Sequence, residues 1–159
     1  MAYDDRDRVG QPVVVTAPGR PPGAGSVLLN VLWLVLAGFW LFVGYIAAGI
    51  VQCVTIIGIP FGIQSFKLAG FALWPFGRSV VRRAGASPSL SCVGNVLWFV
   101  LSGLWLAIGH AVTGALLCLT IIGIPLGVAN FKLIPLALAP FGRDIVRNGD
   151  VVGVGAVVF

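Results

Sequence analysis

Residues 30–60 read NVLWLVLAGFWLFVGYIAAGIVQCVTIIGIP, and residues 95–125 read NVLWFVLSGLWLAIGHAVTGALLCLTIIGIP. Each stretch lies within a longer run, residues 21–66 and residues 84–131, that contains no Asp, Glu, Lys or Arg. A helix needs about 20 apolar residues to cross the hydrocarbon core of a bilayer. A buried helix of a soluble protein seldom needs so long an uncharged run. The two stretches therefore predict an integral membrane protein.

The overall composition supports the same prediction. Only 15 of the 159 residues are charged, 58% are hydrophobic and the mean hydropathy is +1.04, whereas a soluble domain carries about 25% charged residues. The net charge of +5 would suit nucleic acid, but the basic residues flank the apolar stretches and form no patch with interleaved aromatics. We therefore expect the lipid bilayer and anionic lipid head groups as partners, and no nucleic acid.

The two stretches belong to an internal repeat. A shift of 65 residues aligns Asn30–Arg82 with Asn95–Arg147 without a gap, and about thirty of the 53 aligned positions are identical. Random apolar similarity would not keep Trp, Pro, Lys and Arg in register, so the chain contains two tandem copies of one unit.

The identical positions form a motif in each copy: N-x-L-W, then C-x-T-I-I-G-I-P-x-G, then F-K-L and P-F-G-R. This motif resembles the inner-membrane component domain of the YccF family, and the resemblance covers about residues 27–147. It implies a bacterial inner-membrane protein with two such domains, each contributing two membrane segments. It implies little about activity.

The pattern predicts an all-α membrane fold of two helical hairpins. In copy one, the first helix is expected to start near Ser26 to Asn30, capped by one of them, and to end near Gln52–Val54. The second helix, which ends at Trp74, is either a short span or a re-entrant half-helix, because it covers only about 22 Å. The predicted organisation is a polar cytoplasmic tail (1–26), repeat 1 (27–83), a linker (84–91), repeat 2 (92–147) and a short apolar tail (148–159). In that last tail, Val151–Phe159 suits a strand paired with Val13–Thr16 or with a neighbouring chain.

The positions of the arginines predict the topology. Arginines precede copy one, follow it at Arg78–Arg83, and follow copy two at Arg143 and Arg147. Because cytoplasmic loops collect Lys and Arg, all three clusters are cytoplasmic only if each copy goes out and returns. We therefore expect a multi-pass protein of parallel repeats in the bacterial inner (plasma) membrane, with both termini in the cytoplasm.

Small residues follow one face of each first helix and predict close helix packing. One stripe of glycines, at positions 38, 49, 103 and 114, lies on a different side. If one stripe packs the partner helix of the same chain, the other is left for a neighbouring subunit, so we expect a homo-oligomer. Trp33 and Trp98 are expected to anchor at the membrane interface. The predicted packing residues are Ala37, Gly44, Ala48, Ser102, Gly109 and Thr113.

The chain offers few groups for chemistry. Its five carboxylates all lie outside the apolar stretches, and the single His110 aligns with Tyr45. The three cysteines form no C-x-x-C pair and have no His or carboxylate cluster near them in the sequence. We therefore expect them to act as small apolar side chains and not as metal ligands. We expect no catalytic residues, no metal site, no cofactor and no enzyme.

Two charges close to the apolar segments stand out. Lys67 and Lys132 could snorkel to the interface or contact lipid, or they could line a pore or bind an anion, assisted by Arg78 and Arg143. The interrupted helices could line a cavity, as in transporters, or could be plain hairpin turns. The residues of these broken-helix turns are Gly58, Pro60, Gly62, Gly123, Pro125 and Gly127.

Two classes of function follow from these alternatives. The first is a small oligomeric structural or accessory component of the membrane. The second is a channel or transporter subunit with an anion-favouring path lined by Lys67 and Lys132.

Overall fold

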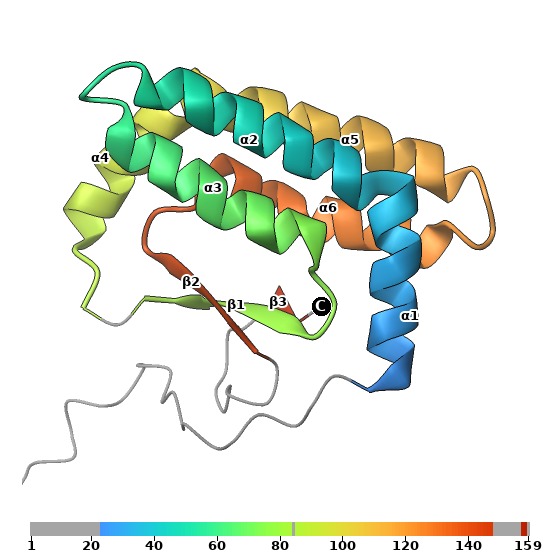
Figure 1. Cartoon of the computed structure of the whole chain (residues 1–159). Helices are drawn as coiled ribbons and strands as arrows, with labels where there is room; N and C mark the ends of the chain where they lie inside the picture. Colours follow the sequence, from blue (N-terminus) through green and yellow to red (C-terminus); the bar gives the residue numbers. More distant parts are fainter. Residues whose placement is uncertain (1–22, 84, 148–156, 159) are drawn as a thin grey trace, which may run out of the picture.

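The computed structural model describes residues 23–83, 85–147 and 157–158, and this part of the chain is mostly helical (Figure 1). Copy one comprises α1 (Ala24–Trp33), a π-helical segment (Leu34–Gly38), α2 (Phe39–Cys53), α3 (Ile59–Leu73) and the strand β1 (Arg78–Arg82). Copy two comprises α4 (Pro88–Trp98), a π-helical segment (Phe99–Gly103), α5 (Leu104–Cys118), α6 (Ile124–Leu138) and the strand β2 (Arg143–Arg147). A third strand, β3, covers Val157–Val158. The predicted tandem helical hairpins are confirmed.

Glycines allow the two helices of each hairpin to touch. A Cβ at Gly62 in α3 would collide with Sγ of Cys53 in α2 and lie 2.8 Å from the carbonyl oxygen of Gly49. A Cβ at Gly49 would itself lie 2.5 Å from the ring of Phe66. The equivalent glycines of copy two make equivalent contacts. Because lipid gives no hydrophobic drive for helix association, this close backbone approach supplies the dispersion energy that holds each hairpin together.

The two hairpins pack against each other through α2 and α5, which run antiparallel. Gln52, at the end of α2, contacts Ser102, which precedes α5, while Tyr45 in the middle of α2 contacts His110 in the middle of α5. Tyr45 and His110 are equivalent positions of the repeat, so an approximate two-fold axis passes between them. In Figure 1, α2 and α5 form the layer farthest from the sheet, and α3 and α6 lie between that layer and the sheet.

Each long helix bends at its π-helical segment. Trp33 is fully buried, and its Nε1 donates a 2.6 Å hydrogen bond to the carbonyl oxygen of Ala72, near the end of α3. Helix carbonyls in the last turn have no intrahelical partner, so the indole satisfies one of them. Its ring lies against Gly38, where a Cβ would come within 2.5 Å of it. The intervening π-helical segment is where α1 turns away from α2 (Figure 1), as π-bulges commonly cause.

The prediction that Trp33 and Trp98 anchor at the membrane interface is therefore wrong. Trp98 is also fully buried and donates a 2.6 Å hydrogen bond to the carbonyl oxygen of Ala137. Both indoles act inside the protein, where they tie the bend of one helix to the end of the next.

Asn30 connects α1 to the turn that follows α3. Its Nδ2 donates to the carbonyl oxygen of Phe76 at 2.8 Å, and its Oδ1 accepts from the Phe76 N–H at 3.0 Å. The next residue, Gly77, has φ 92°, which only glycine adopts readily. Asn95, Phe141 and Gly142 repeat this arrangement, with φ 81° at Gly142. The motif pieces N-x-L-W and P-F-G-R are thus two halves of one contact, and the expectation that Asn30 caps a helix is wrong.

The helices rest on a small antiparallel sheet of order β2-β1-β3. The register places Arg78 opposite Arg147, Val80 opposite Ile145 and Arg82 opposite Arg143. The all-α prediction missed this sheet. A strand in the C-terminal tail is confirmed at Val157–Val158, but it pairs with β1. The proposed partner segment at residues 13–16 lies outside the described residues.

The predicted linker, residues 84–91, contains the start of α4, which begins at Pro88. Ser87 caps this helix and accepts a 3.5 Å hydrogen bond from the Leu90 N–H. In copy one, α1 begins at Ala24, slightly before the predicted start.

Among the described residues, two helical stretches are long and apolar enough to cross a membrane. Ala24–Cys53 has 30 residues and Pro88–Cys118 has 31, and only 28% and 22% of their most apolar windows are buried inside the protein. The core helix of a soluble protein would be mostly buried. These helices instead present their apolar side chains outward, as lipid requires.

Candidate functional site

A chain of polar groups lies at the contact between the two repeats. The Tyr45 hydroxyl lies 3.0 Å from Nε2 of His110, and Nδ1 of His110 lies 3.0 Å from Oδ1 of Asn130. The Asn130 amide also donates to the carbonyl oxygen of Leu126 at 3.5 Å. If Nδ1 carries the proton and donates to Oδ1 of Asn130, Nε2 of the neutral ring accepts from the Tyr45 hydroxyl, so the tautomer decides these roles. The network joins α2 of the first repeat to α5 and α6 of the second.

A second polar pair at the same contact is incompletely satisfied. Nε2 of Gln52 donates a 2.7 Å hydrogen bond to Oγ of Ser102, but the Gln52 Oε1 atom has no hydrogen-bond partner among the described residues. Both side chains are buried. At the equivalent positions the chain carries Leu117 and Ala37, an apolar pair. The polar pair therefore breaks the symmetry of the repeats at one place.

The sheet gathers arginines that lie far apart in the sequence. Two arginine pairs face each other across β1 and β2, Arg78 with Arg147 and Arg82 with Arg143. Directly opposed like charges destabilise a sheet. Anions bound at this surface would therefore reduce the repulsion among the four arginines. Burial lowers the pKa of Arg78, and Arg147 lowers it further; burial and Arg82 do the same for Arg143.

Arg78 and Arg143 also hold the sheet against the helices. The Arg78 guanidinium donates to the carbonyl oxygen of Gly70 at 3.2 Å, and that of Arg143 donates to the carbonyl oxygen of Pro135 at 3.3 Å. Cations near helix C-termini are favoured by the helix dipole. These two residues are half-buried, whereas Arg82 and Arg147 are exposed. The exposed pair is therefore the part of the cluster that a ligand can reach.

The two lysines differ in environment. Nζ of Lys67 lies 2.7 Å from Oδ1 of Asp144, and Arg83 binds the same carboxylate at 2.9 Å. Arg83, then Lys67, lower the pKa of Asp144 to about 2, against an opposing effect of burial. In copy two, Lys132 is exposed, and Ser79 occupies the position equivalent to Asp144. Lys67 thus reaches from α3 to β2, away from the hairpin tip, as a snorkelling lysine does.

Several of the predicted packing residues make contacts within the chain. A Cβ at Gly44 would meet Leu106 of α5 at 3.9 Å, and one at Gly109 would meet Leu41 of α2 at 4.0 Å. Ala37 and Ser102 are buried, while Ala48 and Thr113 are half-buried. The second glycine stripe packs the hairpins, as described for Gly49. Both stripes therefore include residues that make contacts within the chain.

The predicted broken-helix residues lie in, or just after, two turns whose other side chains are exposed. Gly58 and Gly123 end the turns, Pro60 and Pro125 occupy the first turn of the next helices, and Gly62 and Gly127 pack against the preceding helices. The turn residues Ile56 and Ile57 are 87% and 83% exposed. This placement fits a hairpin turn and not the wall of an internal cavity.

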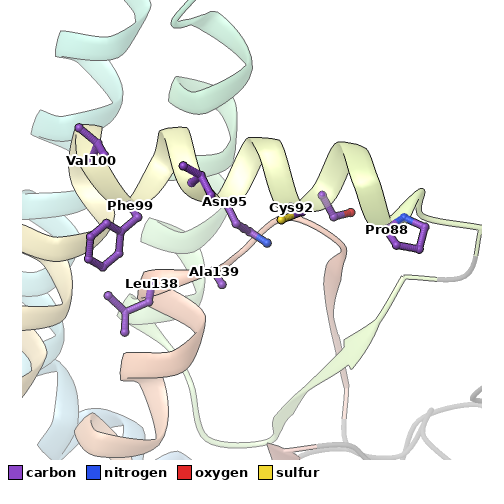
Figure 2. A pocket seen from close by; sticks show the side chains of 9 residues that line it. Pro88, Cys92, Asn95, Phe99, Val100, Leu138 and Ala139 are labelled. Atoms are coloured by element: carbon purple, nitrogen blue, oxygen red, sulfur yellow. The ribbon is translucent and has the colours of Figure 1, made fainter.

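An apolar groove of about 660 Å³ lies between α4 and the end of α6 (Figure 2). Ala139, one of its lining residues, stands where copy one has the much larger Trp74. The groove is open on one side and its lining is almost entirely apolar, so a hydrocarbon chain could lie in it. The lining residues are Pro88, Ser91, Cys92, Asn95, Val96, Phe99, Val100, Leu138 and Ala139.

No cluster of three or more His, Cys, Asp or Glu side chains occurs among the described residues. Cys53, Cys92 and Cys118 are free thiols.

Comparison with known proteins identifies the family. The family model described as the inner membrane component domain, YccF, matches residues 28–78 and again residues 93–143. The chain belongs to the YccF family. It is 35% identical over 127 residues to the inner membrane protein YccF of Escherichia coli (strain K12), and equally to that of Shigella flexneri, covering 75% of this chain and 86% of each relative. No solved structure matches the chain.

Family membership confirms the resemblance seen in the motifs and makes the chain an inner-membrane protein with two tandem YccF domains. Each match ends at the arginine of the P-F-G-R motif. The family pattern thus includes the Asn30–Phe76 connection and the first residue of each strand. The remainder of the strands, which sequence reasoning missed, carries the partner arginines.

Proposed function

We propose that the protein is a structural component of the inner membrane that performs no chemistry and binds anionic lipid head groups through its sheet. The observation that carries this proposal is the pairing of Arg78 with Arg147 and of Arg82 with Arg143. A phosphate placed between two such guanidinium groups would offset their repulsion and accept charge-assisted hydrogen bonds from both. The apolar helices next to the sheet supply the membrane attachment that brings lipid phosphates to it.

The orientation of the protein follows from the same charges. All arginines of the described sheet lie on one side of the helical layers (Figure 1), so we place that side in the cytoplasm, together with both ends of the folded unit. The cytoplasmic leaflet is rich in anionic lipid, and each basic residue near it contributes about 1 kcal/mol of attraction.

The proposal is tested with purified protein in nanodiscs made from phosphatidylcholine alone or with one-third phosphatidylglycerol. Anionic lipid should raise the thermal midpoint of unfolding, and replacing Arg82 and Arg147 by glutamine should remove most of that increase. Arg83→Gln is the matched control, because Asp144 already neutralises this arginine. The proposal would be contradicted if the thermal midpoint were the same in both lipids. It would also be contradicted if Arg83→Gln removed as much of the lipid-dependent increase as the change at Arg82 and Arg147 does.

Homo-oligomerisation and the anion-path alternative stay predictions. The stripes that suggested an oligomer are used inside the chain, and Lys67 is held by a carboxylate next to the sheet. Charge reversal of both lysines to glutamate distinguishes the alternatives: a pore requires a changed anion selectivity in liposomes, whereas the structural proposal requires none.

A further inference from the structure

The approximate two-fold axis runs from the helical layers to the sheet. Equivalent residues of the two copies touch at two places: Tyr45 with His110 between α2 and α5, and Val80 with Ile145 between β1 and β2. A residue that contacts its own equivalent lies at the axis. The axis therefore passes through both pairs, and it is perpendicular to the antiparallel helices α2 and α5.

This symmetry restricts how the chain can sit in a bilayer. Two near-identical copies occupy equivalent environments only if the axis lies in the membrane plane or along the membrane normal. An axis in the plane would make the copies inverted repeats. It would place the arginine-bearing sheet level with the middle of the bilayer, where charged groups are strongly disfavoured.

An axis along the normal removes this conflict. The copies become parallel repeats, and the whole sheet faces the cytoplasm. The helices α2 and α5, which are perpendicular to the axis, then lie across the normal and not along it. The bend at each π-helical segment allows the change of direction, because α1 and α4 can descend to the sheet while α2 and α5 lie flat (Figure 1).

The hairpin tips have the properties of segments immersed in hydrocarbon. The turn at residues 54–58 exposes Val54 by 81% and Ile57 by 83%, and that at residues 119–123 exposes Leu119 by 81% and Ile122 by 73%. Neither turn contains a charged residue. A loop that emerged into water would gain nothing from such side chains, whereas lipid favours them.

The tips also satisfy backbone groups without water. The hydroxyl of Thr55 donates to the carbonyl oxygen of Gln52 at 3.2 Å and accepts from the Gly58 N–H at 3.1 Å. Pro60 removes a donor from the first turn of α3, where N–H groups have no helical partner. Thr120 and Pro125 repeat both features. Hydrocarbon supplies no hydrogen bonds, so a turn within it must provide its own.

We infer that both hairpins are re-entrant: the chain enters the bilayer from the cytoplasmic face alone, and both tips end in the hydrocarbon. Helix layers pack about 8–10 Å apart. The layer formed by α2 and α5 therefore reaches roughly the middle of a 30 Å core, and the surface that this layer presents beyond it is apolar, with Trp40 and Trp105 exposed by 69% and 71%. This arrangement replaces the full crossings that a multi-pass protein requires.

Single cysteines test this inference in cells. In a variant whose three natural cysteines are replaced by alanine, Ile57→Cys and Ile122→Cys report on the tips, and Ser89→Cys, exposed at the start of α4, reports on the side of the sheet. Each variant is exposed to a membrane-impermeant maleimide in spheroplasts and in inverted vesicles. Val54→Cys and Leu119→Cys serve as a second pair if the first pair fails to accumulate.

The expected result is that Ser89→Cys reacts only in inverted vesicles. Both tip variants should react more than about tenfold more slowly than Ser89→Cys from either side, because the reactive thiolate does not form in hydrocarbon, and should react fully in denaturing detergent. Rapid reaction of both tips in spheroplasts would show complete crossings and overturn the inference. Reaction of the two tips from opposite sides would show inverted repeats and overturn it equally. None of these outcomes depends on whether the sheet binds lipid head groups.

Discussion

The polar pair Gln52 and Ser102 offers a quantitative test of the contact between the repeats. Their 2.7 Å hydrogen bond is buried, and Oε1 of Gln52 lacks a partner among the described residues. Interhelical hydrogen bonds in membranes contribute about 0.6 kcal/mol on average, whereas a buried unsatisfied polar group costs about 1–3 kcal/mol. The unsatisfied oxygen should therefore outweigh the bond that accompanies it.

The repeat itself suggests which substitutions to make at this pair. The equivalent pair, Leu117 and Ala37, is apolar and buried, so the double variant Gln52→Leu with Ser102→Ala reproduces a packing that the chain already contains. We expect this double variant to be as stable as the natural protein or more stable by about 1 kcal/mol. Ser102→Ala alone should lose about 1–2 kcal/mol, because it leaves the whole Gln52 amide buried without a partner.

The free energy of unfolding is measured for four proteins: the natural protein, Gln52→Leu, Ser102→Ala and the double variant. Each is titrated with a denaturing detergent in mixed micelles, and the circular dichroism of its helices is followed. The single change at Gln52 serves as an internal control, since a serine hydroxyl can bond to a carbonyl of its own helix. A double variant less stable than Ser102→Ala would refute the reasoning, because it would show that the pair stabilises the contact as a unit.

Three further predictions concern other parts of the structure. Ionised Asp144, whose pKa is lowered to about 2 from 3.8, contributes stability that is complete above pH 3.8 and lost as the pH falls through 2. The deficit of Asp144→Asn, about 0.2–1 kcal/mol at neutral pH, should therefore vanish between about pH 4 and pH 2 in chemical denaturation; a deficit independent of pH would contradict the ion pair. Ala139→Trp should keep the fold, because copy one carries Trp74 there, and should reduce the phospholipid that copurifies with the protein, as counted by mass spectrometry; unchanged lipid would show that the groove is not occupied. Gly62→Ala should lower stability by about 1–3 kcal/mol through overpacking, whereas Gly44→Ala should change it by less than about 0.5 kcal/mol, and thermal midpoints that fall equally would contradict the assigned packing.

Sequence reasoning located the membrane segments because their signal is local. The uncharged runs and the Gly58–Pro60 break fix the helices and the turn without reference to the rest of the chain. The sheet could not be found in this way. Its strands are five residues long, and β1 obtains its pairing partner β2 only after 60 residues of intervening chain have folded into a second hairpin.

The roles of individual side chains were also set by non-local contacts. Asn30 resembles a helix cap in the sequence, but its partner is the backbone of Phe76, 46 residues away. Trp33 resembles an interface anchor, but its partner is a carbonyl at the end of α3. The repeat contained a usable signal, since both residues recur in copy two together with Phe and Gly. A recurring pair of motif pieces indicates contact more directly than the hydrophobicity of either piece.

The antiparallel contact of α2 with α5 is the claim on which the symmetry, the single basic face and the re-entrant hairpins all depend. Oxidative cross-linking in native membranes tests it directly, in a variant whose three natural cysteines are replaced by alanine. Gln52→Cys with Ser102→Cys should form a disulfide within one chain, and Gln52→Cys with Leu117→Cys, the pair that parallel helices would bring together, should not. Cross-linking of the second pair in place of the first would contradict the account.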